Sequence, residues 1–264
     1  MGAAADRNDV RAARRDARAA YYAKDWRACG RLFAQSQRPY EAARCFAQAG
    51  LADDAFATLA HAIDGGLHGE DPTDDSKLEP LHTDPRWATE MAHLSARRAE
   101  WSRDENAELT QLYAQDQADR SPAPGAEIDW TTVEPRDQAR RKRVDEIIAS
   151  RGARVADDYF HAAMVYQHGD TPAEIQRAHD LALKAVALDP DHGLARWLAA
   201  ASEDRKLMYE HRAQKWGTQY KKLDGEWIVW PVDPAITDEQ RDDWEVPPLA
   251  VSLQRAAQMN APAK

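Results

Sequence analysis

Apolar residues recur at helical spacing along most of the chain, and the clearest example lies between residues 193 and 211. Since an α-helix turns by about 100° per residue, Leu194, Trp197, Leu198 and Met208 fall on one stripe of a helix there. Comparable stripes predict further helices over residues 5–23, 53–64, 86–100, 105–120, 157–168, 237–243 and 249–258. The pattern predicts a mainly α fold.

Small and aromatic residues alternate in a repeating order early in the chain. The residues concerned are Trp26, Gly30, Phe33, Ala42, Phe46 and Ala49. Their spacing resembles the tetratricopeptide repeat, in which small residues let two helices of a hairpin approach closely. Ala178, Ala182, Ala185 and Pro190 resemble the second helix of another such hairpin. The resemblance implies helical hairpins over 19–64 with a concave surface for a protein or peptide partner.

Turn-forming residues divide the helices. Gly65-Gly66 predicts a helix end, and 67–86 reads as a loop with at most one helical turn. The segment 121–135 has three prolines and no periodicity, so it is expected to be linker-like. Asp224-Gly225 lies between residues that favour strands and predicts a small β-hairpin within 217–231.

The helix over 105–120 carries inward polar residues of the same kind as the later helices. The domain boundary is therefore expected near residue 103 and not at the linker-like segment. This gives a tetratricopeptide-like region over 1–103 and a C-terminal helical domain over 104–264 with one small β-hairpin.

Composition agrees with a folded helical protein and limits its partners. Hydrophobic residues make up 43% of the 264 residues, and valine and isoleucine are scarce beside alanine, which favours helix over sheet. The net charge of -10 argues against nucleic acid as a partner. No apolar run is long enough to span a membrane. The chain as written is expected in the cytoplasm, and export with removal of a signal sequence is the alternative.

The cysteines and the basic run give little evidence of a metal, cofactor or anion site. Cys29 and Cys45 form no CxxC pattern or cysteine–histidine cluster, so neither a metal nor a cofactor is expected. They are interpreted as two small buried residues, with a disulfide between paired helices as the alternative. The basic run 140–143 has acidic residues close by and is expected on a solvated helix face, with anion binding as the alternative.

Polar residues interrupt three of the apolar stripes. On the helix over 193–211, Arg205 lies within the stripe and Asp204 on its flank, whereas Glu203 points to the solvated side. An inward guanidinium needs a partner, because a buried unpaired charge is costly.

Two other helices show the same interruption. On 105–120, Asp116 and Arg120 share the apolar face, four residues apart, and Gln117 lies at its edge. On 157–168, Gln167 and His168 flank the inner face. These residues predict a polar centre shared by three helices and covered by the loop that contains Gln214, Thr218 and Gln219.

Four short motifs along residues 105–255 resemble, in order, those of an uncharacterised bacterial domain family. They are DQxxR at Asp116–Arg120, QHxD at Gln167–Asp170, DR at Asp204-Arg205 and QxxGTQ at Gln214–Gln219. The resemblance implies that these residues belong together, but it supplies no chemistry. Trp216 stands where that family usually has tyrosine.

The absence of GxGxxG, P-loop, GxSxG and HExxH sequences leaves nucleotide folds, α/β hydrolases and zinc proteases without support. The favoured hypothesis is a protein- or peptide-binding helical-repeat protein with a polar ligand pocket in its C-terminal domain, able to take an anionic small molecule.

The alternative hypothesis is an acid/base enzyme, a hydrolase or acyl or amide transferase acting on a carboxylate-bearing substrate. There His168 is the acid or base, Asp204 or Asp116 orients it, and Arg205 and Arg120 hold the anionic group. A purely structural polar network is the third interpretation.

Overall fold

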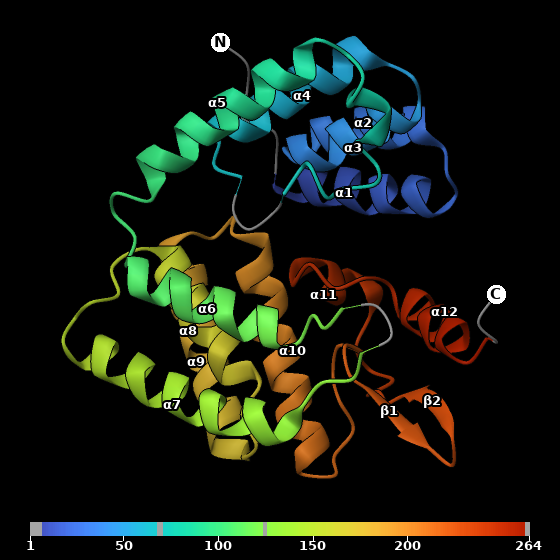
Figure 1. The fold of residues 1–264 in the computed structure, drawn as a ribbon. Helices are drawn as coiled ribbons and strands as arrows, with labels where there is room; N and C mark the ends of the chain where they lie inside the picture. Colours follow the sequence, from blue (N-terminus) through green and yellow to red (C-terminus); the bar gives the residue numbers. More distant parts are fainter. Residues whose placement is uncertain (1–6, 68–70, 124–125, 262–264) are drawn as a thin grey trace. The chain divides into compact units, whose positions relative to one another are not determined.

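The computed structural model describes residues 7–67, 71–123 and 126–261 (Figure 1). The chain divides into two compact units, Met1–Arg103 and Asp104–Lys264, called here the N-terminal and C-terminal units. The described residues are mainly helical with one two-stranded hairpin, which confirms the expected fold class. None of the helices in these ranges has the length and apolarity needed to cross a membrane.

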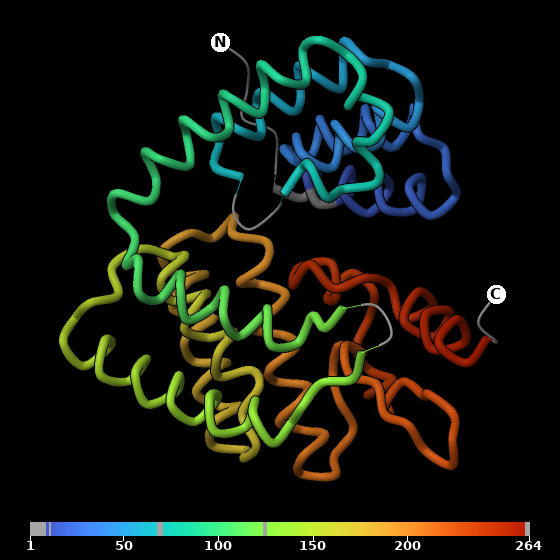
Figure 2. Tube along the Cα trace, viewed as in Figure 1, coloured from blue at the N-terminus to red at the C-terminus, as the bar shows by residue number. Residues whose placement is uncertain are grey.

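In the N-terminal unit the first four helices are joined by short turns, and a longer segment leads to the fifth helix (Figure 2). They are α1 (Arg7–Tyr22), α2 (Trp26–Gln35), α3 (Pro39–Gln48), α4 (Ala52–Asp64) and α5 (Arg86–Trp101), with the 3-10 turn η1 (Glu79–Leu81) before α5. Each of the first four helices packs against the next, so α3 is covered by both α2 and α4.

Close helix packing explains the small residues in this unit. Gly30 on α2 faces Phe46 on α3, and a Cβ atom at Gly30 would lie 2.5 Å from the Phe46 ring. Cys29 and Cys45 occupy facing positions on the same two helices, with Cα atoms 5.8 Å apart. Both are fully buried, as expected, but they form a disulfide instead of remaining free thiols.

The loop expected over 67–86 contains one helical turn, η1, in the part that the structure describes. Its residues 71–81 are called the strap, and Asp75, Lys77 and η1 within it contact α3. Leu78 is fully buried and Leu81 is 2% exposed, so the strap contributes to the core of the N-terminal unit.

The C-terminal unit is a bundle of five longer helices followed by the hairpin and two further helices. They are α6 (Ala107–Asp119), α7 (Trp130–Ala149), α8 (Ala156–Gln167), α9 (Pro172–Leu188), α10 (Gly193–Tyr209), β1 (Tyr220–Leu223), β2 (Glu226–Val229), α11 (Asp238–Asp243) and α12 (Leu249–Met259). Asp224 and Gly225 both have positive φ between β1 and β2, as the hairpin prediction requires.

Helix α7 corrects the expected linker over 121–135. The helix begins at Trp130 and includes Pro135, so only the residues before 130 lie outside it. Asp129 caps the helix by accepting a hydrogen bond from the Thr131 amide, 3.2 Å away. Val133 is buried on the inner face. Capping and burial therefore outweigh the loss of one backbone donor at the proline.

Contacts at helix N-terminal ends link the start of α6 to that of α8, and the start of α8 to that of α10. The Asn106 amide donates to Asp158 Oδ1 at 2.6 Å, which aligns the starts of α6 and α8. His192 Nε2 lies 3.1 Å from Asp157 Oδ1, which aligns the starts of α8 and α10. Towards their other ends, His168 after α8 lies against Asp116 on α6, and Lys206 on α10 donates to Gln176 on α9.

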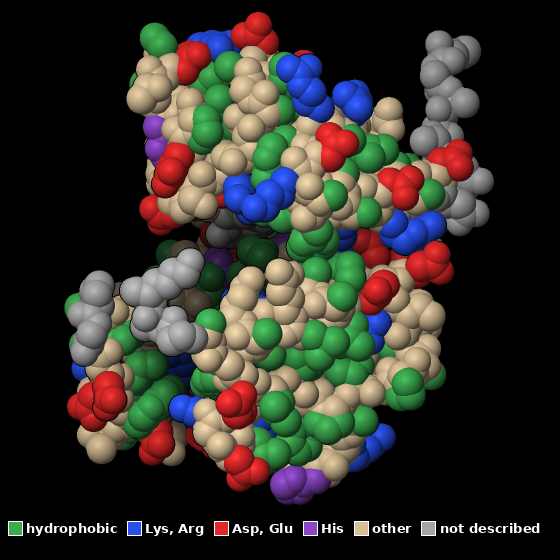
Figure 3. All heavy atoms as spheres, turned by 90° about the vertical axis from the view of Figure 1, so that its right-hand side faces the viewer, with side chains coloured by type: hydrophobic (Ala, Val, Ile, Leu, Met, Phe, Trp, Pro, Cys, Tyr) green, Lys and Arg blue, Asp and Glu red, His purple; other side chains and the backbone are tan. Residues whose placement is uncertain are grey.

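The surface of the described residues mixes charged and hydrophobic side chains on the face drawn in Figure 3. Leu223 on β1 is 53% exposed and Leu253 on α12 is 54% exposed.

Candidate ligand site at the ends of three helices

A buried carboxylate on α6 holds a histidine at the end of α8. His168 Nδ1 lies 2.9 Å from Asp116 Oδ2 and 3.2 Å from Oδ1. Asp116 is fully buried, whereas the His168 side chain is 20% exposed. An ionised carboxylate only accepts hydrogen bonds, so the proton of a neutral His168 is on Nδ1 and Nε2 carries the lone pair. Nε2 has no hydrogen-bond partner among the described residues.

The predicted pairing of Asp116 with Arg120 is present. Arg120 donates to Asp116 Oδ1 at 2.9 Å, and Gln117 Nε2 donates to Asp116 Oδ2 at the same distance. Arg120 also forms an ion pair with Asp137 on α7, with an N–O distance of 2.5 Å. Asp116 is therefore fixed by side chains from α6 and α8, and Arg120 joins it to α7.

Asp137 extends this network, although the sequence interpretation did not include it in the site. It also forms an ion pair with Arg140, whose other terminal nitrogen lies 2.8 Å from Asp119. Burial raises the pKa of Asp137, but hydrogen bonds from Arg120 and Arg140 outweigh burial and leave this pKa below its usual value.

The basic run 140–143 is not a solvated face throughout. Arg140 and Arg141 are each 5% exposed, contrary to expectation. Arg141 forms an ion pair with Glu174, with an N–O distance of 2.8 Å, and a longer one of 3.3 Å with Asp170. The run is mostly neutralised by carboxylates within the unit, which makes anion binding there unfavourable.

Gln167 carries the least satisfied polar group near His168. The residue is 6% exposed, and its Oε1 is buried without a hydrogen-bond partner among the described residues. Seven residues earlier on the same stripe, Phe160 packs against His192, with ring centroids 5.1 Å apart. Because His192 caps the start of α10, Gln167 lies on the side of α8 that faces α10.

Arg205 is half-buried on α10 and not paired with Asp204. Its guanidinium lies 5.9 Å from the Tyr209 ring centroid, and its Nε is buried without a partner among the described residues. Gln167 Oε1 on α8 and Arg205 Nε on α10 are thus buried without a partner, and His168 Nε2 has no partner either, among the described residues. We call these residues, with Asp116, the helix-end corner.

Asp204 serves the loop after α10 instead of the histidine. Its Oδ1 accepts from the amides of Lys215 at 2.8 Å and Trp216 at 2.9 Å. Its Oδ2 accepts from the Thr218 amide at 3.0 Å and the Thr218 hydroxyl at 2.8 Å. Burial raises the pKa of Asp204 despite these donors. With four donors in place, Asp204 is not positioned to orient His168.

Gln214 and Gln219 complete this loop. The fully buried Gln214 donates to the Gln219 carbonyl at 3.0 Å and accepts from its amide at 2.9 Å. Gln219 Nε2 reaches the Ala201 carbonyl on α10 at 3.2 Å. Glu203, expected in solvent, accepts from Trp216 Nε1 at 2.8 Å. We call Asp204, Gln214, Thr218 and Gln219 the loop clasp.

The polar residues predicted to form one centre are therefore divided between the helix-end corner and the loop clasp. Among the described residues, no hydrogen bond or ion pair joins His168 to Asp204 or Arg205. Asp116 takes the orienting position that the sequence left open between Asp116 and Asp204.

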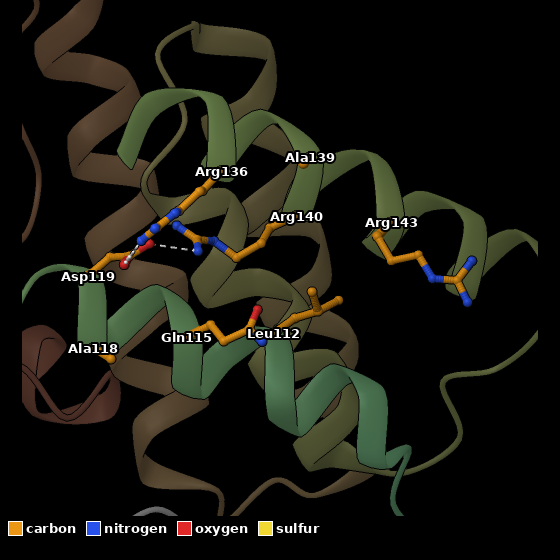
Figure 4. A pocket seen from close by; sticks show the side chains of 8 residues that line it. All are labelled: Leu112, Gln115, Ala118, Asp119, Arg136, Ala139, Arg140 and Arg143. Carbon is orange, nitrogen blue, oxygen red and sulfur yellow. Dashed lines mark hydrogen bonds and ion pairs between the residues drawn. The ribbon is translucent and has the colours of Figure 1, made fainter. Parts of the chain in front are cut away.

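A groove between α6 and α7 lies beside the charged network (Figure 4). It has a volume of about 590 Å³, and its arginines Arg136 and Arg140 both point to Asp119. Arg143, further along, pairs with Glu108 and Glu146. Among the described residues, no group of three or more histidine, cysteine or acidic side chains is arranged to hold a metal ion.

Comparisons with family models, with characterised proteins and with solved structures give no match to this chain. The resemblances to tetratricopeptide repeats and to the uncharacterised bacterial domain remain predictions.

Proposed function

We propose that the chain is a binding protein whose C-terminal unit takes a peptide or a small amide with a carboxylate group at the helix-end corner. The carbonyl oxygen of Gln167 carries this proposal. A buried amide oxygen without a hydrogen bond costs about 1–3 kcal/mol, and a ligand N–H would supply the missing donor.

The other open groups of the helix-end corner indicate the ligand's chemistry. Nε2 of His168 accepts a hydrogen bond from a second N–H or O–H group, because Asp116 fixes the proton on Nδ1. Arg205 has no ion pair among the described residues and suits a carboxylate. A peptide end or an N-acylated amino acid offers an N–H and a carboxylate together.

The proposal is tested by thermal unfolding of the full chain with dipeptides and N-acetyl amino acids at millimolar concentration. A bound compound raises the melting temperature by mass action. We expect the shift in wild type to disappear in Gln167→Met and His168→Gln, and to persist in Gln111→Met, a glutamine change on the exposed side of α6.

Gln167→Met has a second expected effect that distinguishes a binding group from a structural one. Removing the unpaired oxygen at nearly constant volume should raise the free energy of unfolding by about 1 kcal/mol while binding is lost. A shift retained by both site variants, or no compound that shifts wild type, would sink the proposal.

The Asp116–His168 pair favours a second candidate function, acid/base catalysis of hydrolysis or of acyl or amide transfer on a carboxylate-bearing substrate. A buried carboxylate hydrogen-bonded to Nδ1 orients the imidazole and leaves Nε2 without a partner among the described residues. In this arrangement Nε2 can accept a proton from a substrate and return it. If the compound that binds is also turned over, Asp116→Asn should lower kcat, measured at saturating substrate, by at least about tenfold, whatever its effect on binding. Equal kcat values would exclude this role for the pair.

The N-terminal unit is proposed to bind a protein or peptide partner through its helical hairpins. Support comes from the regular pairing of α1 to α4 and from the row of polar side chains along α3 described below.

A further inference from the structure

Three polar side chains on one face of α3 hold the strap. Tyr40, Arg44 and Gln48 follow at intervals of four residues and so share a helix face. The Tyr40 hydroxyl donates to Asp75 Oδ2 at 3.0 Å, and Arg44 Nε forms an ion pair with the same oxygen at 2.8 Å. Gln48 Nε2 donates to the Lys77 carbonyl at 2.9 Å.

Apolar and cation–π contacts also hold the strap against the helices. Leu78 and Leu81 enter the core of the N-terminal unit at 0% and 2% exposure. The Lys77 ammonium lies 5.3 Å from the Trp26 ring centroid on α2. Asp75, Leu78 and Leu81 follow at intervals of three, so the strap presents one carboxylate and two leucines to the same surface.

The α3 side chains offer three kinds of contact to a bound segment. The arginine is itself positioned by two rings, since its guanidinium carbon lies 5.9 Å from the centroids of both Tyr21 and Tyr40. A charged group for a carboxylate, an amide for a main-chain carbonyl and a seat for leucines are features that bind a short segment specifically.

We propose that Tyr40, Arg44 and Gln48 form a peptide-recognition row that the strap fills in cis. The partner of the N-terminal unit then carries the same signature, an acidic residue followed by leucines three and six positions later. This inference rests on the proposed peptide-binding role of the helical hairpins and is independent of the helix-end corner.

Because the strap occupies the row, a partner binds there only by displacing it. A segment tethered by a short loop acts at an effective concentration of about millimolar, so a free partner must displace it. The apparent affinity for the partner equals the intrinsic affinity multiplied by the fraction of chains in which the strap has left the row. The strap is thus an autoinhibitory contact that limits binding to partners with a better-fitting segment or a high local concentration.

The test is a titration of the full chain with a fluorescent peptide of residues 71–82. Asp75→Ala in the chain removes the carboxylate that Tyr40 and Arg44 hold, so we expect the peptide to bind this variant at least tenfold more tightly than wild type. Adding Arg44→Ala to that variant should abolish the gain, and a peptide that itself carries Asp75→Ala should bind at least tenfold more weakly.

Asp74→Ala is the matched control, because Asp74 is an exposed neighbour on the same strap. Made in the chain or in the peptide, it should leave the affinity within twofold. Gln167→Met in the chain should also leave peptide affinity unchanged, which separates failure at α3 from failure at the helix-end corner.

Absence of peptide binding to a folded Asp75→Ala chain would overturn the proposal and make the strap a purely structural part of the core. If that variant does not fold, Asp75→Asn, which keeps the side-chain shape and removes the charge, is titrated with the same expectation. No gain in peptide affinity for Asp75→Asn would likewise overturn it.

Discussion

Asp116 and Asp204 are both fully buried aspartates beside an apolar stripe, yet they have different surroundings. Asp116 accepts from the side chains of Gln117, Arg120 and His168, whereas Asp204 accepts mainly from backbone amides of its own loop. Side-chain partners can exchange a proton or be replaced by a ligand, while backbone amides mainly fix a loop. The chemistry proposed for this chain therefore rests on Asp116 and His168, on α6 and α8, and not on Asp204.

His161 is the residue whose surroundings predict a pH effect on stability. It is 9% exposed and stacks on Tyr113, with ring centroids 4.7 Å apart. Burial lowers its pKa and outweighs the attraction of Asp157 and Asp158. The unfolded chain then takes up the proton more readily than the folded chain. The contribution of His161 to stability is complete above the unfolded pKa of about 6.5. It is lost as pH falls toward the folded pKa.

The measurement is urea unfolding of the C-terminal unit at pH values between 8 and 5, in wild type and in His161→Phe. The phenyl ring keeps the stack on Tyr113 but has no proton to bind, so the loss of stability toward low pH should become smaller. His61→Gln, on an exposed position of α4, should leave the pH dependence unchanged. A wild-type slope in His161→Phe would contradict the assignment.

Among the elements, the helices and the hairpin were predictable because their stripes and turn residues act locally. Charged residues on an inner stripe were harder to recognise. Val133, Asp137, Arg140, Val144 and Ile147 are all buried on α7 and alternate at intervals of four and three. The stripe was present in the sequence, but the adjoining charges obscured it. Only the fold explains why Asp137 and Arg140 are buried. Their partners Arg120 and Asp119 are about twenty residues away along the chain.

Ion pairs of these charged residues help to hold α7 against α6. The free energy of unfolding should therefore fall at acidic pH. The folded pKa of Asp137 lies below the unfolded value of about 3.9, so its stabilisation is complete above that value and is lost as pH falls through the folded pKa. Asp137→Asn should lower the free energy of unfolding at pH 7 by about 2 kcal/mol, the scale of hydrogen bonds to a charged group.

Urea unfolding between pH 7 and pH 3 checks this expectation. Asp137→Asn should lose less additional stability toward pH 3 than wild type, because the group that would be protonated is gone. Glu134→Gln, an exposed change on the same helix, serves as the control and should follow wild type. If Asp137→Asn and Glu134→Gln have the same stability at pH 7, the ion pairs of Asp137 contribute nothing measurable.

The limits of sequence reasoning also appear in the pairing of distant segments. The interrupted apolar stripes predict one centre for His168, Asp204 and Arg205, because each lies on or beside the inner face of its helix. Which face of each helix end meets which neighbour depends on how α6, α8 and α10 cross, and that is set by contacts of high sequence separation. The strap is a similar case. Its composition predicts a loop, but nothing local to it indicates that Asp75 meets Tyr40 and Arg44.

On the scale of the whole molecule, each unit has its own core. In the N-terminal unit it is built around the fully buried Leu59 and Ile63, and in the C-terminal unit around Leu109, Leu181 and Leu198. The candidate sites follow this division: among the described residues, the polar contacts given for the helix-end corner lie after residue 103 and those given for the strap lie before it. Separate cores predict that damage to one unit is not transmitted to the other.

Leu109→Ala tests this independence. Leu109 is fully buried on α6, so its truncation should destabilise the C-terminal unit by about 2–5 kcal/mol. Hydrogen exchange followed by mass spectrometry should then show faster exchange in peptides from 107–209 and unchanged exchange in peptides from 26–64. Leu59→Ala, on α4, should give the reverse pattern. Faster exchange in both units from either change would mean that they unfold as one cooperative body. In that case a ligand at the helix-end corner would also stabilise the strap, because binding raises the cost of every opening that disrupts its site.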